Sequence, residues 1–100
     1  MNNEKWATFL VTADICLIEQ AVEVAGIIIT ASEANACAVA IYDGVNTNGK
    51  LFGYFRVPAN NSKNFKFAQP VTCNYGLYID IDANTNSVMV IYKPVSETEV

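Results

Sequence analysis

The residues best suited to chemistry form a run of oxygen-bearing side chains near the C-terminus. Asp80, Asp82, Asn84 and Asn86 follow one another at every second position. Oxygen ligands at this spacing occur in calcium-binding loops, and two neighbouring carboxylates could act as a general acid and base. The calcium pattern is incomplete, because a threonine replaces the sharp-turn glycine and an isoleucine replaces the bidentate glutamate. We therefore interpret the run as the solvent face of a strand entering an Asn-rich turn, with a weak adventitious cation site as the alternative.

Other catalytic constellations are missing from the sequence. The chain has no histidine, which is the usual general base at neutral pH and the commonest metal ligand. No serine stands in a Gly-x-Ser-x-Gly motif, and the glycines are isolated. The cysteines Cys16, Cys37 and Cys73 are odd in number and lie among apolar or small residues, which favours buried thiols over disulfides. We expect no catalytic residue, no metal site, no cofactor and no enzymatic activity.

Composition indicates surplus apolar surface. Hydrophobic residues make up 52% of the 100 residues and charged residues 16%, against roughly 25% charged residues in ordinary soluble domains. A single domain of this size leaves roughly a third of its unfolded-chain surface exposed, so one copy has difficulty burying this apolar load. We expect a partner to cover part of it.

Charge and hydropathy argue against two classes of partner. The six Lys and Arg residues are scattered in a chain of net charge −4, so no basic stripe is available for nucleic acid. The most apolar run, residues 21–31, is shorter than the roughly twenty residues that span a bilayer. The N-terminus lacks the pattern of a secretory signal. We expect no direct nucleic-acid or membrane binding, and synthesis in the cytoplasm.

The elements that must position these residues are β-strands. Short apolar or alternating runs separated by polar turns at roughly ten-residue spacing predict a sandwich or barrel. Pro58 and Pro70 are expected to interrupt pairing, and the last two strands are expected to form a hairpin. The predicted strands cover residues 26–30, 36–42, 51–57, 65–67, 77–82 and 88–92.

The first quarter of the chain is more ambiguous. Residues 6–11 predict a strand, and residues 13–24 fit a strand pair better than a helix because they are rich in β-branched side chains. A helix remains the alternative. We expect one domain over residues 1–94, in which residues 1–24 could be an arm or a segment exchanged between copies, and a mobile acidic tail over residues 95–100.

Strand parity separates core residues from candidate interface residues. Phe55, Phe65 and Phe67 are expected in the core, whereas Tyr42, Tyr54 and Tyr78 have the opposite parity to the main apolar set and suit an outer recognition face. Ala36, Ala38 and Ala40 share a parity that either lets another surface approach closely or packs on both sides inside the fold. Met89 and Ile91 leave neither face of the last strand polar, so we expect another sheet or subunit to cover it. Trp6 and Phe9 could supply cover.

Five segments of the sequence carry a family resemblance: GIIITAS at 26–32, AVAIYDG at 38–44, NGKL at 48–51, NYGLYIDID at 74–82 and VMVIY at 88–92. Together they resemble small virion structural proteins of tailed bacteriophages, the capsid decoration or cement proteins. The resemblance covers roughly residues 24–93 and departs from the family pattern at Tyr75 and in the Asn-rich loops. It implies a jelly-roll-like β-sandwich of about seven or eight short antiparallel strands that sits on capsid or neck proteins.

These observations predict a non-enzymatic virion structural protein, a capsid decoration, cement or neck-associated subunit located in the virion and made in the host cytoplasm. Its expected partners are the major capsid protein or other virion proteins and further copies of itself, with a trimer favoured. The alternative function is a carbohydrate-binding or adhesin-type β-sandwich module, which would use exposed aromatic side chains.

Overall fold

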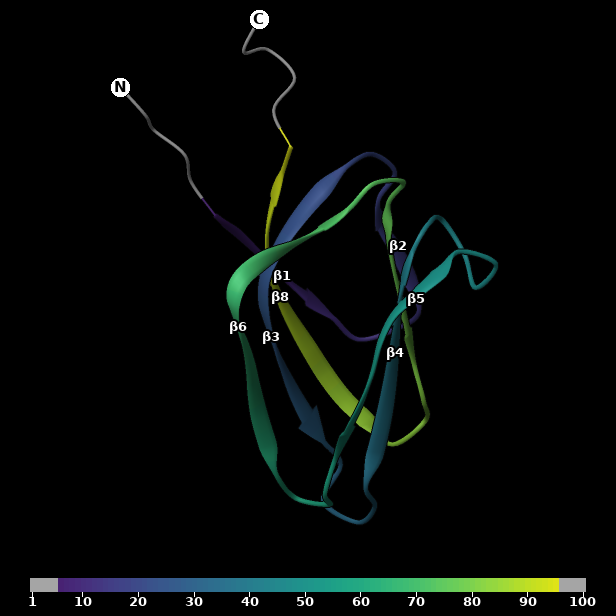
Figure 1. Ribbon diagram of the computed structural model, residues 1–100. Coiled ribbons are helices and arrows are strands. Elements are labelled where there is room, and N and C mark those ends of the chain that lie inside the picture. The colour runs from purple at the N-terminus through teal and green to yellow at the C-terminus, as the bar shows by residue number, and fades with distance from the viewer. Residues whose placement is uncertain (1–5, 96–100) are drawn as a thin grey trace, which may run out of the picture.

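The computed structural model describes residues 6–95, which fold into two four-stranded antiparallel sheets packed face to face (Figure 1). The prediction of an all-β sandwich of about eight strands is confirmed. The strands are β1 (Ala7–Val11), β2 (Ile15–Ile18), β3 (Val22–Ala31), β4 (Cys37–Asp43), β5 (Lys50–Val57), β6 (Ser62–Cys73), β7 (Leu77–Ile81) and β8 (Thr85–Pro94).

The strand order is that of a jelly roll. One sheet, called sheet A below, has the order β1-β8-β3-β6, and the other, sheet B, has the order β2-β7-β4-β5. The first strand therefore pairs with the last, the second with the second last, and so on inwards to the pair β4 and β5. A long hairpin rolled into two layers gives this arrangement, which belongs to the double-sheet sandwiches.

The core lies between the inner faces of the two sheets. Along β3 the side chains alternate between buried and half-buried, as expected when successive residues point to opposite faces. No polar or charged residue in the described range is buried. The largest fully buried side chains are Ile27, Ile29, Ile41, Leu77, Ile79, Val11, Val22, Val24, Val39, Val57, Val88 and Val90.

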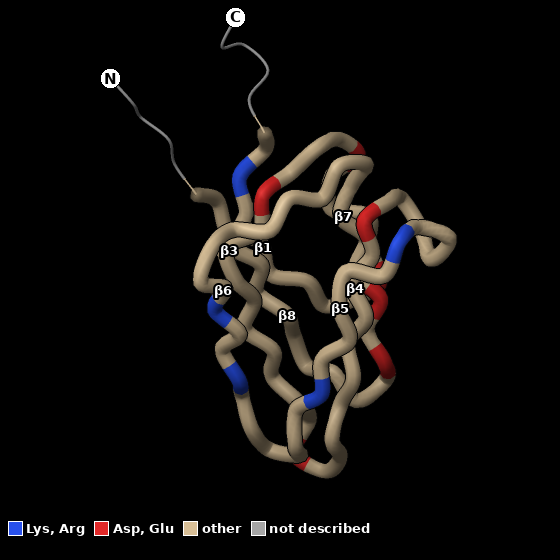
Figure 2. The backbone as a smooth tube through the Cα atoms, in the orientation of Figure 1, with Lys and Arg blue, Asp and Glu red and all other residues tan. Residues whose placement is uncertain are grey.

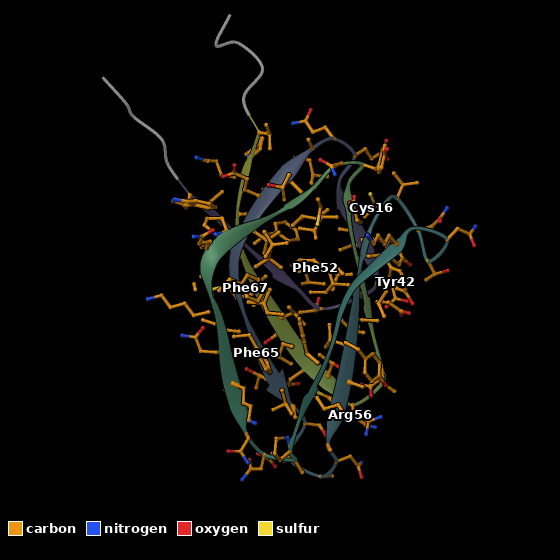
Figure 3. All side chains as sticks on the ribbon, in the orientation of Figure 1. Cys16, Tyr42, Phe52, Arg56, Phe65 and Phe67 are labelled. Carbon is orange, nitrogen blue, oxygen red and sulfur yellow. The ribbon has the colours of Figure 1, made fainter. Side chains whose placement is uncertain are left out.

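Aromatic side chains close one open edge of the sandwich. Phe52 on β5 packs against Phe67 on β6 with ring centroids 5.8 Å apart, and Phe55 packs against Phe65 at 5.0 Å (Figure 3). All four rings contact the core cluster, which confirms the expectation for Phe55, Phe65 and Phe67. Each such pair contributes roughly 0.5–1.5 kcal/mol beyond its area burial.

The first quarter of the chain consists of strands, which confirms the preference for strands over a helix at residues 13–24. Within the same chain, β1 pairs with β8 and β2 pairs with β7. Residues 1–5 and 96–100 lie outside the described residues, and with them most of the expected acidic tail. The first residue of that tail, Val95, donates a backbone hydrogen bond to the carbonyl of Ala21 at 3.1 Å.

The expected hairpin of the last two strands is wrong, because β7 belongs to sheet B and β8 to sheet A. The Asn-rich turn crosses between the layers instead of joining paired neighbours. Strand β8 gains more by lying between β1 and β3, where Val88 and Val90 are fully buried against the core. Turn composition alone does not distinguish a hairpin from a crossing between sheets.

The expected short strand at residues 65–67 is also wrong, because β6 runs from Ser62 to Cys73 and contains Pro70. Two features make the proline tolerable. Strand β6 is at the edge of sheet A, and its pairing with β3 shifts register between Val24 and Gly26. Edge strands and bulges are where a residue without an N–H group does no harm to the hydrogen-bond ladder.

Candidate interaction surfaces

Four side chains form a continuous apolar and aromatic row across the outer face of sheet B. Cys16 on β2 is paired with Tyr78 on β7, Tyr78 with Tyr42 on β4, and Tyr42 with Leu51 on β5. The Tyr42 and Tyr78 rings have centroids 6.4 Å apart and are tilted by 54°, and Leu51 is 52% exposed. We call these four residues the tyrosine row; Figure 3 labels Cys16 at one end and Tyr42 near the other.

The alanines beside the tyrosine row have small side chains, so the middle of this face does not project from the sheet. Ala40 is paired with Asp80 on one side and Tyr54 on the other, and Ala38 is paired with Arg56. Ala40 is only 7% exposed because larger neighbours shade it. The inner side of β4 packs on the core, so the alanines do line an outer face.

Ala36, expected in the same strand, lies before β4 begins at Cys37 and is exposed. It precedes the first paired residue of β4, so strand alternation does not determine where its side chain points. The alanine surface of sheet B therefore consists of Ala38 and Ala40.

Two carboxyl groups make this face acidic next to the tyrosine row. Burial, the negative charge of Asp14 and a hydrogen bond between the two carboxyl groups raise the pKa of Asp80 above its usual value. Partial desolvation, followed by the charges of Asp14 and Asp80, also raises the pKa of Tyr78. A cationic group of a partner would relieve this repulsion.

The carboxylates around sheet B also replace missing strand hydrogen bonds. Asp14 Oδ1 accepts from the backbone N–H of Ile81 at 2.9 Å, and Asp82 Oδ2 accepts from that of Ala38 at 2.9 Å. Both contacts lie where a neighbouring strand has ended. Asp43 accepts from the backbone N–H groups of the two residues that follow β6, at 3.0 and 2.8 Å.

The oxygen-rich run singled out in the sequence begins on β7 at Asp80, passes through a turn held by Asp82 and ends on β8 at Asn86. Besides Ala38, the carboxylate of Asp82 accepts from the backbone of Asn84 at 3.0 Å and the hydroxyl of Thr85 at 2.8 Å. No group of three or more His, Cys, Asp or Glu side chains within residues 6–95 is arranged to hold a metal ion. The carboxylate of Asp82 thus connects β4 to the turn before β8 through hydrogen bonds, which we call the Asp82 clip.

An open hollow of about 510 Å³ lies at one end of the sandwich, between the β4–β5 loop and the residues that follow β6. Its polar groups are engaged locally. Asp43 binds the backbone of Asn74 and Tyr75, and the side-chain oxygen of Asn46 accepts from the N–H of Asn48 at 2.8 Å. These contacts connect the end of β4 to the residues after β6 and order the β4–β5 loop.

The cysteines are free thiols with different surroundings. Cys37 and Cys73 are buried, as expected, whereas Cys16 is half-buried in the tyrosine row, which corrects its assignment to the interior. Burial and the charge of Asp43 raise the pKa of Cys73 to about 12. Burial, with a smaller contribution from the charge of Glu19, raises the pKa of Cys16. A raised pKa reduces the thiolate fraction and so disfavours a nucleophilic role.

The outer face of sheet A carries an aliphatic patch, which we define as Leu10, Ile28, Met89 and Ile91. Met89 is paired with Leu10 on one side and Ile28 on the other, and Ile91 lies two positions along the same strand. Leu10 is 55% exposed and the other three side chains are partly exposed. No other sheet of the described chain covers Met89 and Ile91, because Val88, Val90 and Tyr92 are the β8 side chains that pack on the core. The alternative, cover by another subunit, stays a prediction.

Phe9 does not cover the aliphatic patch, and Trp6 lies beside Lys93, two positions along β8 from Ile91. Trp6 precedes β1 and lies with its ring centroid 4.9 Å from the Lys93 ammonium group. Phe9 is paired with Val90, which places it on the opposite parity from Leu10, at the open edge of the sandwich and 41% exposed. Phe9 thus belongs to sheet A and Trp6 lies just before its strand β1, whereas Ala38, Ala40, Tyr42, Tyr54 and Tyr78 belong to sheet B.

Sequence reasoning missed several residues of these surfaces, namely Asp14, Cys16, Leu51 and the aliphatic patch members Leu10 and Ile28. Strand parity could have placed Ile28 outside, since it alternates with the buried Ile27 and Ile29. It could not place Leu51, because the register of β5 shifts between Ile41 and Tyr42 of its partner. Such a shift depends on contacts between strands.

None of the described residues forms a helix long and apolar enough to cross a membrane. Comparison of the chain with protein-family models, curated proteins and solved structures found no match. The fold and surfaces define an antiparallel β-sandwich of jelly-roll topology with an apolar row or patch on both outer faces. The relation to phage decoration proteins stays a prediction from the sequence segments.

Proposed function

We propose that this protein is a non-enzymatic virion structural subunit, of the capsid decoration, cement or neck-associated kind, that binds neighbouring coat proteins through its outer sheet faces. The observation that carries this proposal is the presence of apolar side chains on both outer faces of a sandwich whose core is already complete. Leu10 and Leu51, on opposite faces, are each more than half exposed. Apolar surface of this kind in a soluble domain is typical of protein-contact sites.

The tyrosine row has the properties of a docking surface. Its residues lie on strands, so little side-chain or backbone freedom is lost when a partner binds. Tyrosine combines a large apolar area with a polar hydroxyl and is enriched at protein interfaces. The small side chains of Ala38 and Ala40 next to it let the surface of a partner approach closely. A specific contact requires about 800 Å² per partner, which the outer face of a four-stranded sheet can supply.

The edge strands offer a second, smaller means of contact. The edge strands are β1 and β6 in sheet A and β2 and β5 in sheet B. Strand β5 carries Lys50 and Arg56, and β6 carries Lys63, Lys66 and Pro70, which discourage pairing with another chain, while β2 is only 4 residues long. Strand β1 is also an edge strand and has no charged residue between Ala7 and Val11. An added strand from a coat protein would pair best along β1.

Co-sedimentation with coat particles tests the proposal. The particles are those of the virus that carries the gene, prepared without this protein, and the purified chain is added at increasing ratios. We expect saturable co-sedimentation of the wild type and its loss in Tyr78→Glu, which places a charge in the tyrosine row. Thr47→Glu, which adds the same charge to the exposed β4–β5 loop, is the matched control and is expected to bind. A folded wild type that stays in the supernatant at every ratio contradicts the proposal.

A carbohydrate-binding module is the second candidate, and Tyr54 is the observation that favours it. This ring is 55% exposed on the outer face of sheet B, with the low Ala40 beside it and Asp80 beyond. An exposed ring near hydrogen-bonding groups suits a sugar face. Two features weaken this candidate: the Arg56 guanidinium carbon lies 5.4 Å from the centroid of Tyr54, and the Tyr42 and Tyr78 rings are not coplanar. Glycan-array binding that Tyr54→Ala removes would favour it over the virion role.

A further inference from the structure

The two outer faces of the sandwich differ in charge. The outer face of sheet A carries Lys66 and Lys93 and one acidic residue, Glu23, which pairs with Lys93 at 3.7 Å. Lys63 is paired with the buried Ile29 and has the opposite parity. On the outer face of sheet B, Asp80 and the adjoining Asp14 lie next to the tyrosine row, and Arg56, paired with Ala38, is a cation on the β5 side of the same face. Figure 2 shows acidic residues along the β4 and β7 side together with basic residues on β5 in the same layer, and basic residues on β6 in the opposite layer.

Lys66 belongs to the outer face of sheet A. It is paired with Gly26, which is paired on its other side with Ile91 of the aliphatic patch. The patch is therefore flanked by a cation, while the tyrosine row is flanked by two carboxyl groups. On the outer face of sheet A, Glu23 offsets Lys93 and leaves Lys66, whereas on the outer face of sheet B Arg56 offsets one of the two carboxyl groups.

A contact that set the Asp14 and Asp80 side of one copy against the same side of another would bring four carboxyl groups together. That arrangement adds like-charge repulsion to a pair whose ionisation is already disfavoured in one copy. Contact between the aliphatic face of one copy and the acidic face of the next places Lys66 opposite the carboxyl groups. It also sets Leu10 and Met89 against a face on which Ala38 and Ala40 have small side chains.

We propose that the protein binds a second copy of itself head to tail, with the aliphatic patch of one copy packed on the tyrosine row of the next. The contact is heterologous, so it builds a ring where the rotation between copies closes and a filament where it does not. This inference names a partner for surfaces on which the proposed function also rests. It is nevertheless tested with the purified protein alone.

Two single variants test the contact through a mixing experiment. Leu10→Glu damages only the aliphatic patch and Leu51→Glu damages only the tyrosine row; both side chains are exposed on edge strands, so the fold is expected to survive. Sedimentation velocity measures the mass of each variant against the 10.9 kDa of one chain. We expect a self-associating wild type and a loss of at least about tenfold in association for either variant, the size of effect that a central interface residue produces.

The mixture of the two variants gives the decisive result. Each retains one intact face, so an equimolar mixture is expected to form a one-to-one dimer and nothing larger, because the two damaged faces repel each other. Thr47→Glu carries the same added charge in an exposed loop and is expected to associate like the wild type. Thr8→Glu and Tyr54→Glu form a second pair, on the same two faces, if either leucine variant fails to fold.

Three results would overturn the proposal. A wild type that is monomeric at all accessible concentrations has no such contact. Normal association of Leu51→Glu indicates a symmetric contact through the aliphatic patch, and normal association of Leu10→Glu indicates one through the tyrosine row. A protein that does not self-associate but still binds particles would contradict this inference and leave the proposed function intact. A protein that self-associates but does not bind particles would contradict only the proposed function.

Discussion

The carboxylate of Asp82 accepts a hydrogen bond from the backbone N–H of Ala38, with an N···Oδ2 distance of 2.9 Å, between residues 44 positions apart in the chain. Strand β7 ends at Ile81, which is paired with Val39, so no strand carbonyl is available opposite Ala38. The side chain takes its place. The same carboxylate also holds the turn that carries the chain from sheet B to sheet A.

Replacing Asp82 by alanine is expected to destabilise the protein by about 2 kcal/mol or more, since hydrogen bonds to charged groups are worth about 1.5–3 kcal/mol and the Ala38 N–H loses its partner. Urea denaturation followed by circular dichroism measures the change. Asp82→Asn retains one acceptor oxygen and should lose less. Equal stability of Asp82→Ala and the wild type would show that the clip contributes nothing.

Asp80 is expected to reduce stability at neutral pH. Its pKa is raised above the ordinary 3.8 by burial and by Asp14, so the folded protein binds this proton more tightly than the unfolded chain. The resulting stabilisation is fully present below the unfolded pKa and is lost as pH rises through the raised pKa of the folded state. Asp80→Asn should therefore be more stable than the wild type at neutral pH, by less than about 1 kcal/mol because solvent screens the pair.

Thermal unfolding of the wild type and Asp80→Asn across the acidic range measures this difference. The gap between their Tm values should close as pH falls toward the unfolded pKa of the carboxyl group. A gap that is independent of pH would contradict an origin in this carboxyl pair. Asp14→Asn is the less suitable variant, because Asp14 also accepts the hydrogen bond from Ile81.

The three thiols should react with disulfide reagents at very different rates in the native protein. Cys16 lies on an outer face and should react first, more slowly than a free thiol because its pKa is raised. Cys73, buried and with its pKa raised to about 12, should stay protected until the protein unfolds. Thiol titration with and without denaturant measures the rates, and fast native labelling of Cys73 would contradict its burial.

Gly53 makes room for an aromatic ring on its own strand. A Cβ atom built at Gly53 would lie 2.6 Å from Cζ of Phe55, whose ring packs on Phe65 across the open edge. Gly53→Ala should displace that ring and cost roughly 1–3 kcal/mol, the usual effect of overpacking. The double variant Gly53→Ala with Phe55→Leu should lose less than the sum of the single changes, because the clash is gone. Strict additivity in denaturation measurements would rule out this coupling.

The sequence predicts well what depends on strand alternation. The parity of residues 36–42 and 77–82 placed Tyr42 and Tyr78 on the outer face, where the structure has them side by side. It predicts poorly what depends on which strands meet. The crossing between β7 and β8, the continuation of β6 through Pro70 and the contact of Asp14 with Ile81, 67 positions away, are set by long-range pairing. No local pattern of turn residues contains that information.

Binding of coat proteins by the outer faces is tested most directly by hydroxyl-radical footprinting of the chain on particles and free in solution. Tyr75, 73% exposed in the β6–β7 loop, is an internal control that shares the chemistry of Tyr42, Tyr54 and Tyr78. We predict that oxidation falls severalfold on particles for the residues of at least one outer face, either the three tyrosines of sheet B or Met89 of sheet A. Tyr75 should stay reactive. Unchanged oxidation of Tyr42, Tyr54, Tyr78 and Met89 in the bound protein would contradict docking through the sheet faces.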